Sequence, residues 1–297
     1  MKKDEIKNIL VPVDFTETSE IAVDEAVGLA LELNAVLHLI HIVDNSESVS
    51  FVDRELELAL SSLYDVEKEA GVKLSGIAEE IDFKYGIKPV FETSIGLIHT
   101  EILQYVEEHN INLIVMGTHG ASGYKEYIIG SNAQRIVSHA KIPVLTLQQG
   151  KTTTGFKNIL IPIDNSLHSR EKVNLALIVA DLFDAKIHIL GLLDSKEKTE
   201  LNKFKTKLKA IEIVIAADEL PYSTTIVDGD SLAEEAMAYA AEHRCDLIVI
   251  NTGHESKIGS AFLGAFAQHI VNHSKIPVLS LNHHSDHYMI STPGFGI

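Results

Sequence analysis

The chain has 297 residues, enough for two domains of about 150 residues with a hydrophobic core each. Its formal net charge of −17 excludes nucleic acid as an expected partner, because nucleic acid binding requires Lys and Arg to neutralise phosphates. The single cysteine excludes an internal disulfide and fits a reducing compartment. The amino terminus has no signal-peptide pattern, and no apolar run approaches the ~20 residues of a membrane span. We therefore expect a cytoplasmic protein.

Short β-branched runs alternate with amphipathic helical stretches along the first half of the chain. We expect strands near 6–13, 36–42, 88–93, 112–116 and 143–147, and helices near 18–33, 53–84, 97–109 and 131–139. This alternation predicts an α/β fold, a doubly wound, Rossmann-like parallel sheet of five strands with helices on both faces. The nearly continuous apolar run 113–116 is typical of a strand that is buried on both faces.

The second half of the chain repeats the first. The run from Lys7 to Asp14 returns 150 residues later, and the run from Ala133 to Leu145 returns 134 residues later. The second copy is therefore about 16 residues shorter in its middle. A period this long indicates a duplicated domain and not a solenoid, whose repeats are about 20–50 residues long.

We therefore expect two tandem domains with the same five-stranded fold. The first covers residues 1–149, the second covers residues 155–283, and residues 284–297 form a carboxyl-terminal tail. Each copy ends in an apolar strand that we expect at the edge of its sheet. Because exposed edges tend to be paired, these strands would join the copies as an intramolecular pseudo-dimer, and a homodimer is the other assembly that the pattern allows.

A glycine-containing loop lies between a buried strand and a helix of the first copy. It contains Gly117, His119 and Gly120, and after nine further residues Gly130 and Ser131. Glycines let the backbone approach a ligand closely, and a serine at a helix start adds a hydroxyl to N–H groups that favour an anion. The pattern predicts a phosphate cradle, although flexible surface loops also collect these residue types.

This loop resembles the nucleotide-binding signature of the universal stress protein family, Gly-x2-Gly-x9-Gly-Ser/Thr, at every fixed position. The first strand, which ends at Asp14, resembles the strand whose terminal aspartate faces the nucleotide in that family. The resemblance covers nearly the whole chain, because the domain occurs twice. It implies an adenine nucleotide α-hydrolase-like fold and a site for ATP with Mg²⁺.

The resemblance also implies roles for single residues at the phosphate end of the site. Gly117, Gly120 and Gly130 would shape the loop around phosphates and ribose, and Ser131 would hydrogen-bond phosphate oxygens. His119 would contact phosphate when protonated, or simply face solvent.

At the base end, Asp14 would accept hydrogen bonds from adenine or ribose, or else cap a turn or helix. The main chain of Ile42 would read adenine, Met116 would touch the ligand with one edge, and Asn132 completes the expected site beside the serine. No general base is recognisable around the loop, so binding is favoured over hydrolysis.

The second copy departs from the signature at three positions. Asn251 and His254 stand where the first copy has its two leading glycines, and Ala265 replaces the serine, while Asp164 is retained. Added Cβ atoms restrict the backbone and occupy the space of the nucleotide. We therefore expect the second copy to have lost ATP binding and to act as a structural or regulatory partner.

Histidines gather late in the chain: His254, His269, His273, His283, His284 and His287. Residues 269 and 273 are four apart on an expected helix, which suits a metal such as zinc, although packing and a solvated tail explain the same residues.

The leading hypothesis is an ATP-binding, nucleotide-dependent stress-response module with one competent site in the first domain. Two alternatives stay open at this point. One is a slow ATPase or autophosphorylating enzyme that uses Ser131 or a nearby hydroxyl as acceptor. The other is a nucleotide-independent protein whose histidine-rich second domain holds a metal or an apolar ligand.

Overall fold

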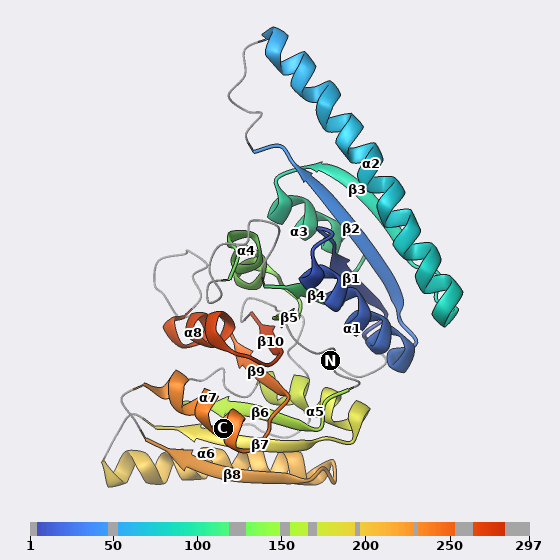
Figure 1. The fold of residues 1–297 in the computed structure, drawn as a ribbon. Coiled ribbons are helices and arrows are strands. Elements are labelled where there is room, and N and C mark those ends of the chain that lie inside the picture. Colours follow the sequence, from blue (N-terminus) through green and yellow to red (C-terminus); the bar gives the residue numbers. More distant parts are fainter. Residues whose placement is uncertain are drawn as a thin grey trace. The chain divides into compact units, whose positions relative to one another are not determined.

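The computed structural model describes residues 5–46, 53–118, 129–148, 155–165, 171–193, 197–228, 231–252 and 264–282. The chain divides into two compact units, one from Ile6 to Gly155 and one that begins at Phe156 (Figure 1). The division falls within the polar, glycine-containing stretch that follows the first copy. Each unit is described below on its own.

The first unit is a parallel sheet with the strand order β3-β2-β1-β4-β5. Its strands are β1 (Asn8–Pro12), β2 (Val36–Asp44), β3 (Val90–Gly96), β4 (Leu113–Gly117) and β5 (Val144–Leu147). Its helices are α1 (Glu17–Leu33), α2 (Asp53–Tyr85), α3 (Ile98–Glu108) and α4 (Ser131–His139). Helices α1 and α2 cover one face of the sheet, and α3 and α4 cover the other (Figure 1). The predicted doubly wound fold is confirmed.

The central strand of this unit is buried on both faces. Ile9, Leu10 and Val11 in β1 have no exposed surface, and β1 pairs with β2 on one side and with β4 on the other. The chain order reverses between β1 and β4, and in doubly wound sheets a ligand lies outside the carboxyl ends of the strands at such a point.

Strands β2 and β3 run two and three residues further than the sequence predicts, and Asp44 at the end of β2 lines the cavity that is described below. Asp44 pairs with Gly96 at the end of the β2–β3 ladder. The last residues, Asp44 and Gly96, are not marked by apolar periodicity, although Val43 and Ile95 before them continue the apolar pattern beyond the predicted ends.

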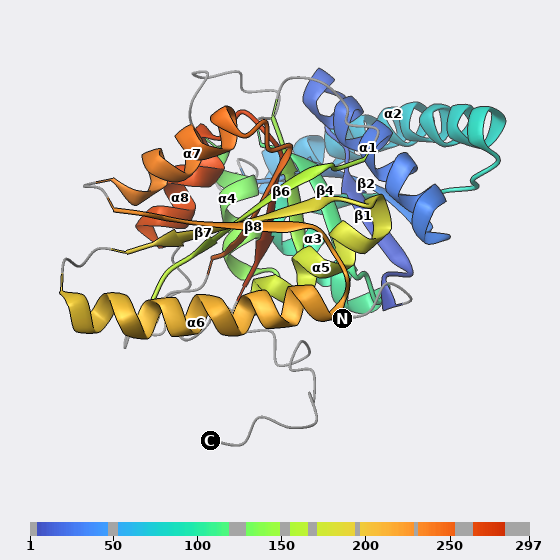
Figure 2. The same cartoon turned by 90° about the horizontal axis from the view of Figure 1, so that it is seen from below.

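The second unit repeats this architecture with the strand order β10-β9-β6-β7-β8, again parallel. Its elements are β6 (Asn158–Ile163), α5 (Glu171–Phe183), β7 (Lys186–Leu192), α6 (Lys198–Ala217), β8 (Tyr222–Val227), α7 (Leu232–Glu242), β9 (Leu247–Asn251), α8 (Ala265–His273) and β10 (Val278–Leu281). Helices α5 and α6 lie on one face, and α7 and α8 on the other (Figure 2).

Equivalent hydrogen bonds fix the same strand register in both units. Asn8 pairs with Val36 in the first unit, and the residues 150 positions later, Asn158 and Lys186, pair in the second. The side chain of Asn112 accepts the N–H groups of residues 7 and 8, as Asp246 accepts those of 157 and 158. The internal repeat in the sequence is therefore a repeat of structure.

Within each unit, β5 and β10 pair on one side only, with β4 and β9 respectively, as expected for edge strands. Their pairing with each other as a pseudo-dimer stays a prediction. Within the described residues, none of the helices has a stretch that is both long enough and apolar enough to cross a bilayer.

Gly191 in β7 lies at a position in the second unit where the neighbouring side chains leave no room for a Cβ atom. A Cβ atom at this position would lie 2.8 Å from Leu208 Cδ1 and 2.9 Å from Phe204 Cε1, and both neighbouring side chains are buried. We expect Gly191→Ala to lower the free energy of unfolding of this unit by about 1–3 kcal/mol, as overpacking does in close-packed cores. Urea unfolding measures this change. The matched control is Gly28→Ala in α1, where nothing lies within 4 Å of the added atom and helix propensity favours alanine; equal losses in both variants would contradict the prediction.

Candidate functional site

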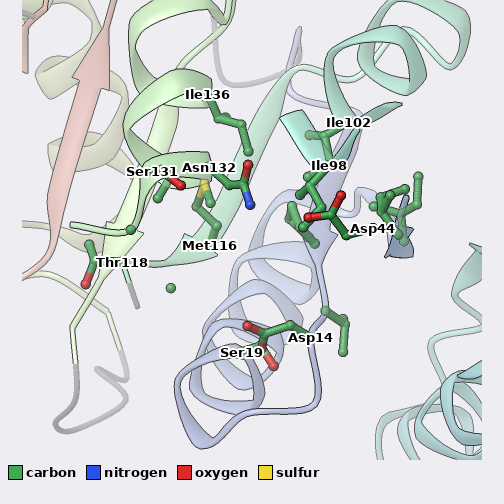
Figure 3. A pocket seen from close by; sticks show the side chains of 17 residues that line it. Asp14, Ser19, Asp44, Ile98, Ile102, Met116, Thr118, Ser131, Asn132 and Ile136 are labelled. Atoms are coloured by element: carbon green, nitrogen blue, oxygen red, sulfur yellow. The ribbon is translucent and has the colours of Figure 1, made fainter. Parts of the chain in front are cut away.

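A cavity of about 350 Å³ opens at the carboxyl ends of β1, β2 and β4 in the first unit (Figure 3). Its apolar lining consists of Pro12, Val13, Ile40, Ile42, Ile98, Ile102, Met116, Ala133 and Ile136. Its polar and glycine lining consists of Asp14, Ser19, Asp44, Gly117, Thr118, Gly130, Ser131 and Asn132. The cavity lies at the switch point of the sheet, where an α/β fold places its ligand.

Seven of the nine residues predicted for the site line this one cavity, although they come from four separate parts of the chain. They are Asp14, Ile42, Met116, Gly117, Gly130, Ser131 and Asn132. The other two predicted residues, His119 and Gly120, lie outside the described residues. The roles assigned to all nine remain predictions.

Asp14 is held in a fixed orientation by the turn between β1 and α1. Its Oδ1 accepts hydrogen bonds from the main-chain N–H of Thr16 at 3.1 Å and from the Thr16 hydroxyl at 2.5 Å. Thr16 in turn is the N-cap of α1, where its side chain accepts the N–H of Ser19. The carboxylate of Asp14 therefore shapes this turn and also lines the cavity, while its hydrogen bonds to adenine or ribose stay a prediction.

The end of β2 leaves main-chain groups free of their usual strand partner. The ladder between β1 and β2 ends where Val13 N–H donates to Ile40 O at 2.8 Å, whereas β2 continues to Asp44. Ile42 lies two residues beyond Ile40, so its N–H and C=O groups point to the same edge of β2. Within the described chain no β1 residue pairs with Ile42, and these groups can therefore meet a ligand.

The start of α4 supplies hydrogen-bond donors. Gly130 is the N-cap of this helix without a side-chain capping bond, and the first turn contains no acidic residue. Ser131, Asn132 and Ala133 in that turn line the cavity. The N–H groups of a first helical turn have no partner within the helix, and together with the helix dipole they favour an anion.

Gly117 is required by close packing and not by an unusual backbone angle. A Cβ atom there would lie 2.7 Å from Thr18 Cγ2 and 3.1 Å from Thr18 Cβ, and Thr18 is a buried residue of α1. The glycine therefore lets α1 approach the end of β4 and holds that side of the cavity in place.

The charge of the described lining is negative. Asp14 and Asp44 contribute two carboxylates, and no Lys, Arg or His is among the described lining residues. A phosphorylated ligand would therefore depend on the donors of α4 and on a cation. Carboxylate and hydroxyl oxygens are ligands that Mg²⁺ accepts, so these residues fit a magnesium-bound anion.

The corresponding region of the second unit has a different charge pattern. Lys172 in α5 is 5% exposed and occupies the position that Ala22 has in the first unit. Burial lowers the pKa of Lys172 to about 8, opposed in part by Asp164 and reinforced by Lys207. Lys207 Nζ donates to the main-chain oxygen of Asp164 at 2.6 Å. Two lysines therefore surround the retained aspartate, whereas no cation lies among the described lining residues at Asp14.

The predicted metal ligands are only partly within the described residues. On α8 the rings of His269 and His273 lie 4.5 Å apart. Across the described ranges, no three His, Cys, Asp or Glu side chains are grouped as a metal site. His254 and the tail histidines lie outside these ranges. Zinc binding stays a prediction without support from the described side chains.

Comparison with known proteins identifies the two repeats. The family model described as the universal stress protein family matches residues 5–148 and 155–281. The chain belongs to this family. It carries two Usp domains in tandem, and the matched ranges correspond to the two structural units.

Single-domain relatives match about half of the chain. A universal stress protein of Methanocaldococcus jannaschii is 33% identical over 146 residues, which cover 49% of this chain and 84% of the relative. A second protein of that organism is 27% identical over 156 residues, covering 48% of this chain and 95% of the relative.

A solved structure has the same tandem fold. The crystal structure of a universal stress protein from Archaeoglobus fulgidus covers 93% of this chain and 98% of its own length, with a TM-score of 0.74 and 20% identity. This likeness confirms the fold of the tandem Usp chain.

The cavity also contains residues that sequence analysis did not select. Ser19, Asp44 and Thr118 add polar groups, and Ile98 and Ile102 of α3 with Ile136 of α4 add apolar walls. Asp44 follows Ile42 by two residues, and this spacing on a strand would have placed it on the same face. The isoleucines had no distinguishing signal, since apolar residues of core-facing helices look the same whether they line a core or a cavity.

Proposed function

We propose that the first Usp domain binds ATP with Mg²⁺ and that the protein is a cytoplasmic, nucleotide-dependent stress-response module. The observation that carries the proposal is the single cavity in which Asp14, Gly117, Gly130 and Ser131 meet. These residues are separated by about a hundred positions in the chain, and each belongs to the nucleotide-binding pattern of the family.

The lining suggests how a nucleotide would lie. The isoleucine walls and Met116 suit the faces of a purine ring, and the main chain of Ile42 with the carboxylate of Asp14 suits its polar edge or the ribose. The donors at the start of α4 suit the phosphates. When bound, Mg²⁺ would neutralise phosphate charge in a cavity whose described side chains carry two carboxylates.

The nucleotide is proposed to act as a conformational ligand and not as a substrate. It would contact both the end of β4 and the start of α4, so occupancy would be coupled to the surface formed by these elements. The second domain is proposed to be a structural or regulatory partner without ATP, because Asn251 and Ala265 replace a glycine and the serine.

Calorimetric titration of MgATP into nucleotide-stripped protein tests this proposal. We expect one site per chain. Asp14→Ala should weaken binding at least tenfold, whereas the matched variant Asp164→Ala at the equivalent strand end should leave the affinity unchanged. Thermal unfolding of each variant shows whether it is folded.

Three results would overturn parts of the proposal. No binding by folded, stripped protein removes the nucleotide function. Two sites per chain, or a loss of binding in Asp164→Ala, shows that the second domain is competent. Sustained hydrolysis of ATP that disappears in Asp14→Ala would make the protein an enzyme.

A further inference from the structure

A buried histidine and a tyrosine form a cluster on the α3 side of the first domain. His38 in β2 is 6% exposed, and its Nδ1 lies 3.0 Å from the hydroxyl oxygen of Tyr105 in α3. The ring of His109 stacks on Tyr105 with centroids 3.8 Å apart, and its centroid lies 5.9 Å from that of His38. The three rings therefore form a compact triangle, in which both histidines contact a buried tyrosine.

The hydrogen bonds of this cluster suit a neutral His38. Asn8 Nδ2 donates to the main-chain oxygen of Asn110 at 3.2 Å, so Asn8 Oδ1 faces His38 Nε2, at 3.4 Å. Nε2 therefore carries the ring hydrogen, and Nδ1 accepts the hydroxyl hydrogen of Tyr105. Protonation of Nδ1 would turn this nitrogen into a donor, so that the Tyr105 hydroxyl hydrogen loses its acceptor and a positive charge is buried beside it.

The second domain contains the same cluster at equivalent positions. His188 in β7 is 3% exposed, with Nδ1 3.4 Å from the hydroxyl of Tyr239 and Nε2 3.3 Å from Asn158 Oδ1. His243 stacks on Tyr239 at 3.8 Å, and its centroid lies 5.6 Å from that of His188. The geometry thus occurs twice in one chain.

No described carboxylate pairs with either buried ring, and the charged groups that act on the rings, His109 on His38 and Lys186 with His243 on His188, oppose protonation. His38 meets Asn8 from β1, Tyr105 from α3 and His109 from the C-cap of α3, while Glu92 of β3 acts on Tyr105. Burial lowers the pKa of His38, and His109 lowers it further. The same Tyr105 hydroxyl has its pKa raised to about 12 by burial, so it stays protonated.

The neighbours of His188 act in the same direction. Ser223 of β8 lies 3.4 Å from Nδ1, and Thr225 of the same strand lies 3.4 Å from the Tyr239 hydroxyl. Burial lowers the pKa of His188 to about 4, with further contributions from Lys186 on its own strand and from His243 at the C-cap of α7.

We propose that these two histidine–tyrosine clusters make each Usp domain acid-responsive, so that proton uptake at the buried histidine loosens the packing of the histidine strand against α3 or α7. Above pH 6.5, the approximate pKa of a histidine in the unfolded state, the buried histidines are neutral in both states and the domains have their full free energy of unfolding. As the pH falls below that value, the unfolded state binds a proton that the folded state rejects, and stability is lost until the folded pKa is reached. The response does not depend on nucleotide.

Hydrogen exchange of the full chain at pH 7.5 and pH 5, corrected for the intrinsic exchange rate, tests the proposal. We expect protection of amides in β7 and α7 to fall about thirtyfold between these pH values, the change that a histidine with the pKa of His188 implies. We also expect the protection of amides in β2 and α3 to fall at pH 5, because of proton uptake linked to His38. His188→Gln and His38→Gln should each abolish the loss in their own domain only.

Exposed histidines provide matched controls. His139→Gln at the end of α4 and His273→Gln at the end of α8 should leave both losses unchanged. Because a glutamine variant can fail to fold, proton NMR titration of the wild-type histidines gives an independent readout. Ordinary titration of His38 and His188 near pH 6.5 in the folded protein, or equal protection at both pH values, would overturn the proposal.

Discussion

Gly117→Val is expected to lower the affinity of the protein for MgATP about a hundredfold. The first added atom would already lie 2.7 Å from Thr18 Cγ2, and the branched valine methyl groups extend further into the same space. Since Thr18 is 3% exposed, α1 would have to move away from β4. A displaced wall would move the ends of β1 and β4 away from the ligand, and the loss of two charge-assisted hydrogen bonds of about 1.5 kcal/mol each corresponds to a change in Kd of about a hundredfold.

Calorimetric titration measures this affinity, and urea unfolding separates it from a loss of fold. The control Gly28→Ala changes a glycine of α1 that has open space around it, so its Kd should equal that of the wild type. The Kd of Gly117→Ala should lie between the values of Gly117→Val and Gly28→Ala. Wild-type affinity in folded Gly117→Val protein would show that the contact between α1 and β4 does not shape the nucleotide site.

The fold was predictable because its signals are local and occur twice. Alternating strands and helices predicted the parallel sheet, and the repeated run at Asn8 and Asn158 predicted two copies, which share the same register in the structure. The ends of β2 and β3 were not predicted, since Asp44 and Gly96 continue a ladder by main-chain bonds that leave no apolar pattern.

The candidate site was predictable only where a residue has a chemical signature. Asp14, Gly117 and Ser131 stand at strand or helix ends, and the topology of a doubly wound sheet brings such ends together. The need for glycine at 117 was predictable, but its cause was not. It depends on the buried position of Thr18, a contact between elements about a hundred residues apart.

The histidine clusters show a second reason why part of the structure could not be predicted from the sequence. His38 and Tyr105 are each ordinary residues of an apolar strand and an amphipathic helix, and nothing in either segment indicates the other. Their meeting at 3.0 Å depends on how α3 packs on β2. The pair Glu108-His109 returns in the sequence as Glu242-His243, but this repeat does not indicate which buried histidine lies beside it.

Lys172 is the clearest departure of the second domain from the first. Alignment of the repeats pairs this buried lysine with Ala22, so the second domain has added a charge to a position that is apolar in the first. No described side chain forms an ion pair with it, and Asp164 only partly offsets the effect of burial on its pKa. The charged form therefore lowers the stability of the folded domain at neutral pH.

Lys172→Met is expected to raise the free energy of unfolding of the second domain by about 3 kcal/mol at pH 7, because the pKa of Lys172 is lowered from 10.5 to about 8. A depressed lysine pKa means that the unfolded state binds more protons between these values. The loss of stability that charged Lys172 causes in the wild type is therefore complete below pH 8, and it decreases as the pH rises toward 10.5.

Urea unfolding of both proteins at pH 7 and pH 9.5 measures the difference, which should shrink from about 3 to about 1 kcal/mol. Comparing variant with wild type at each pH removes the effect of Cys245 and Tyr105, whose pKa values of about 12 lower stability of both proteins at alkaline pH. Lys203→Met, an exposed lysine of α6, is the control and should show no pH-dependent gain. A Lys172→Met protein no more stable than wild type at pH 7 would mean that the buried amine has a partner that compensates its charge, and the second Usp domain would then hold an anion beside Asp164.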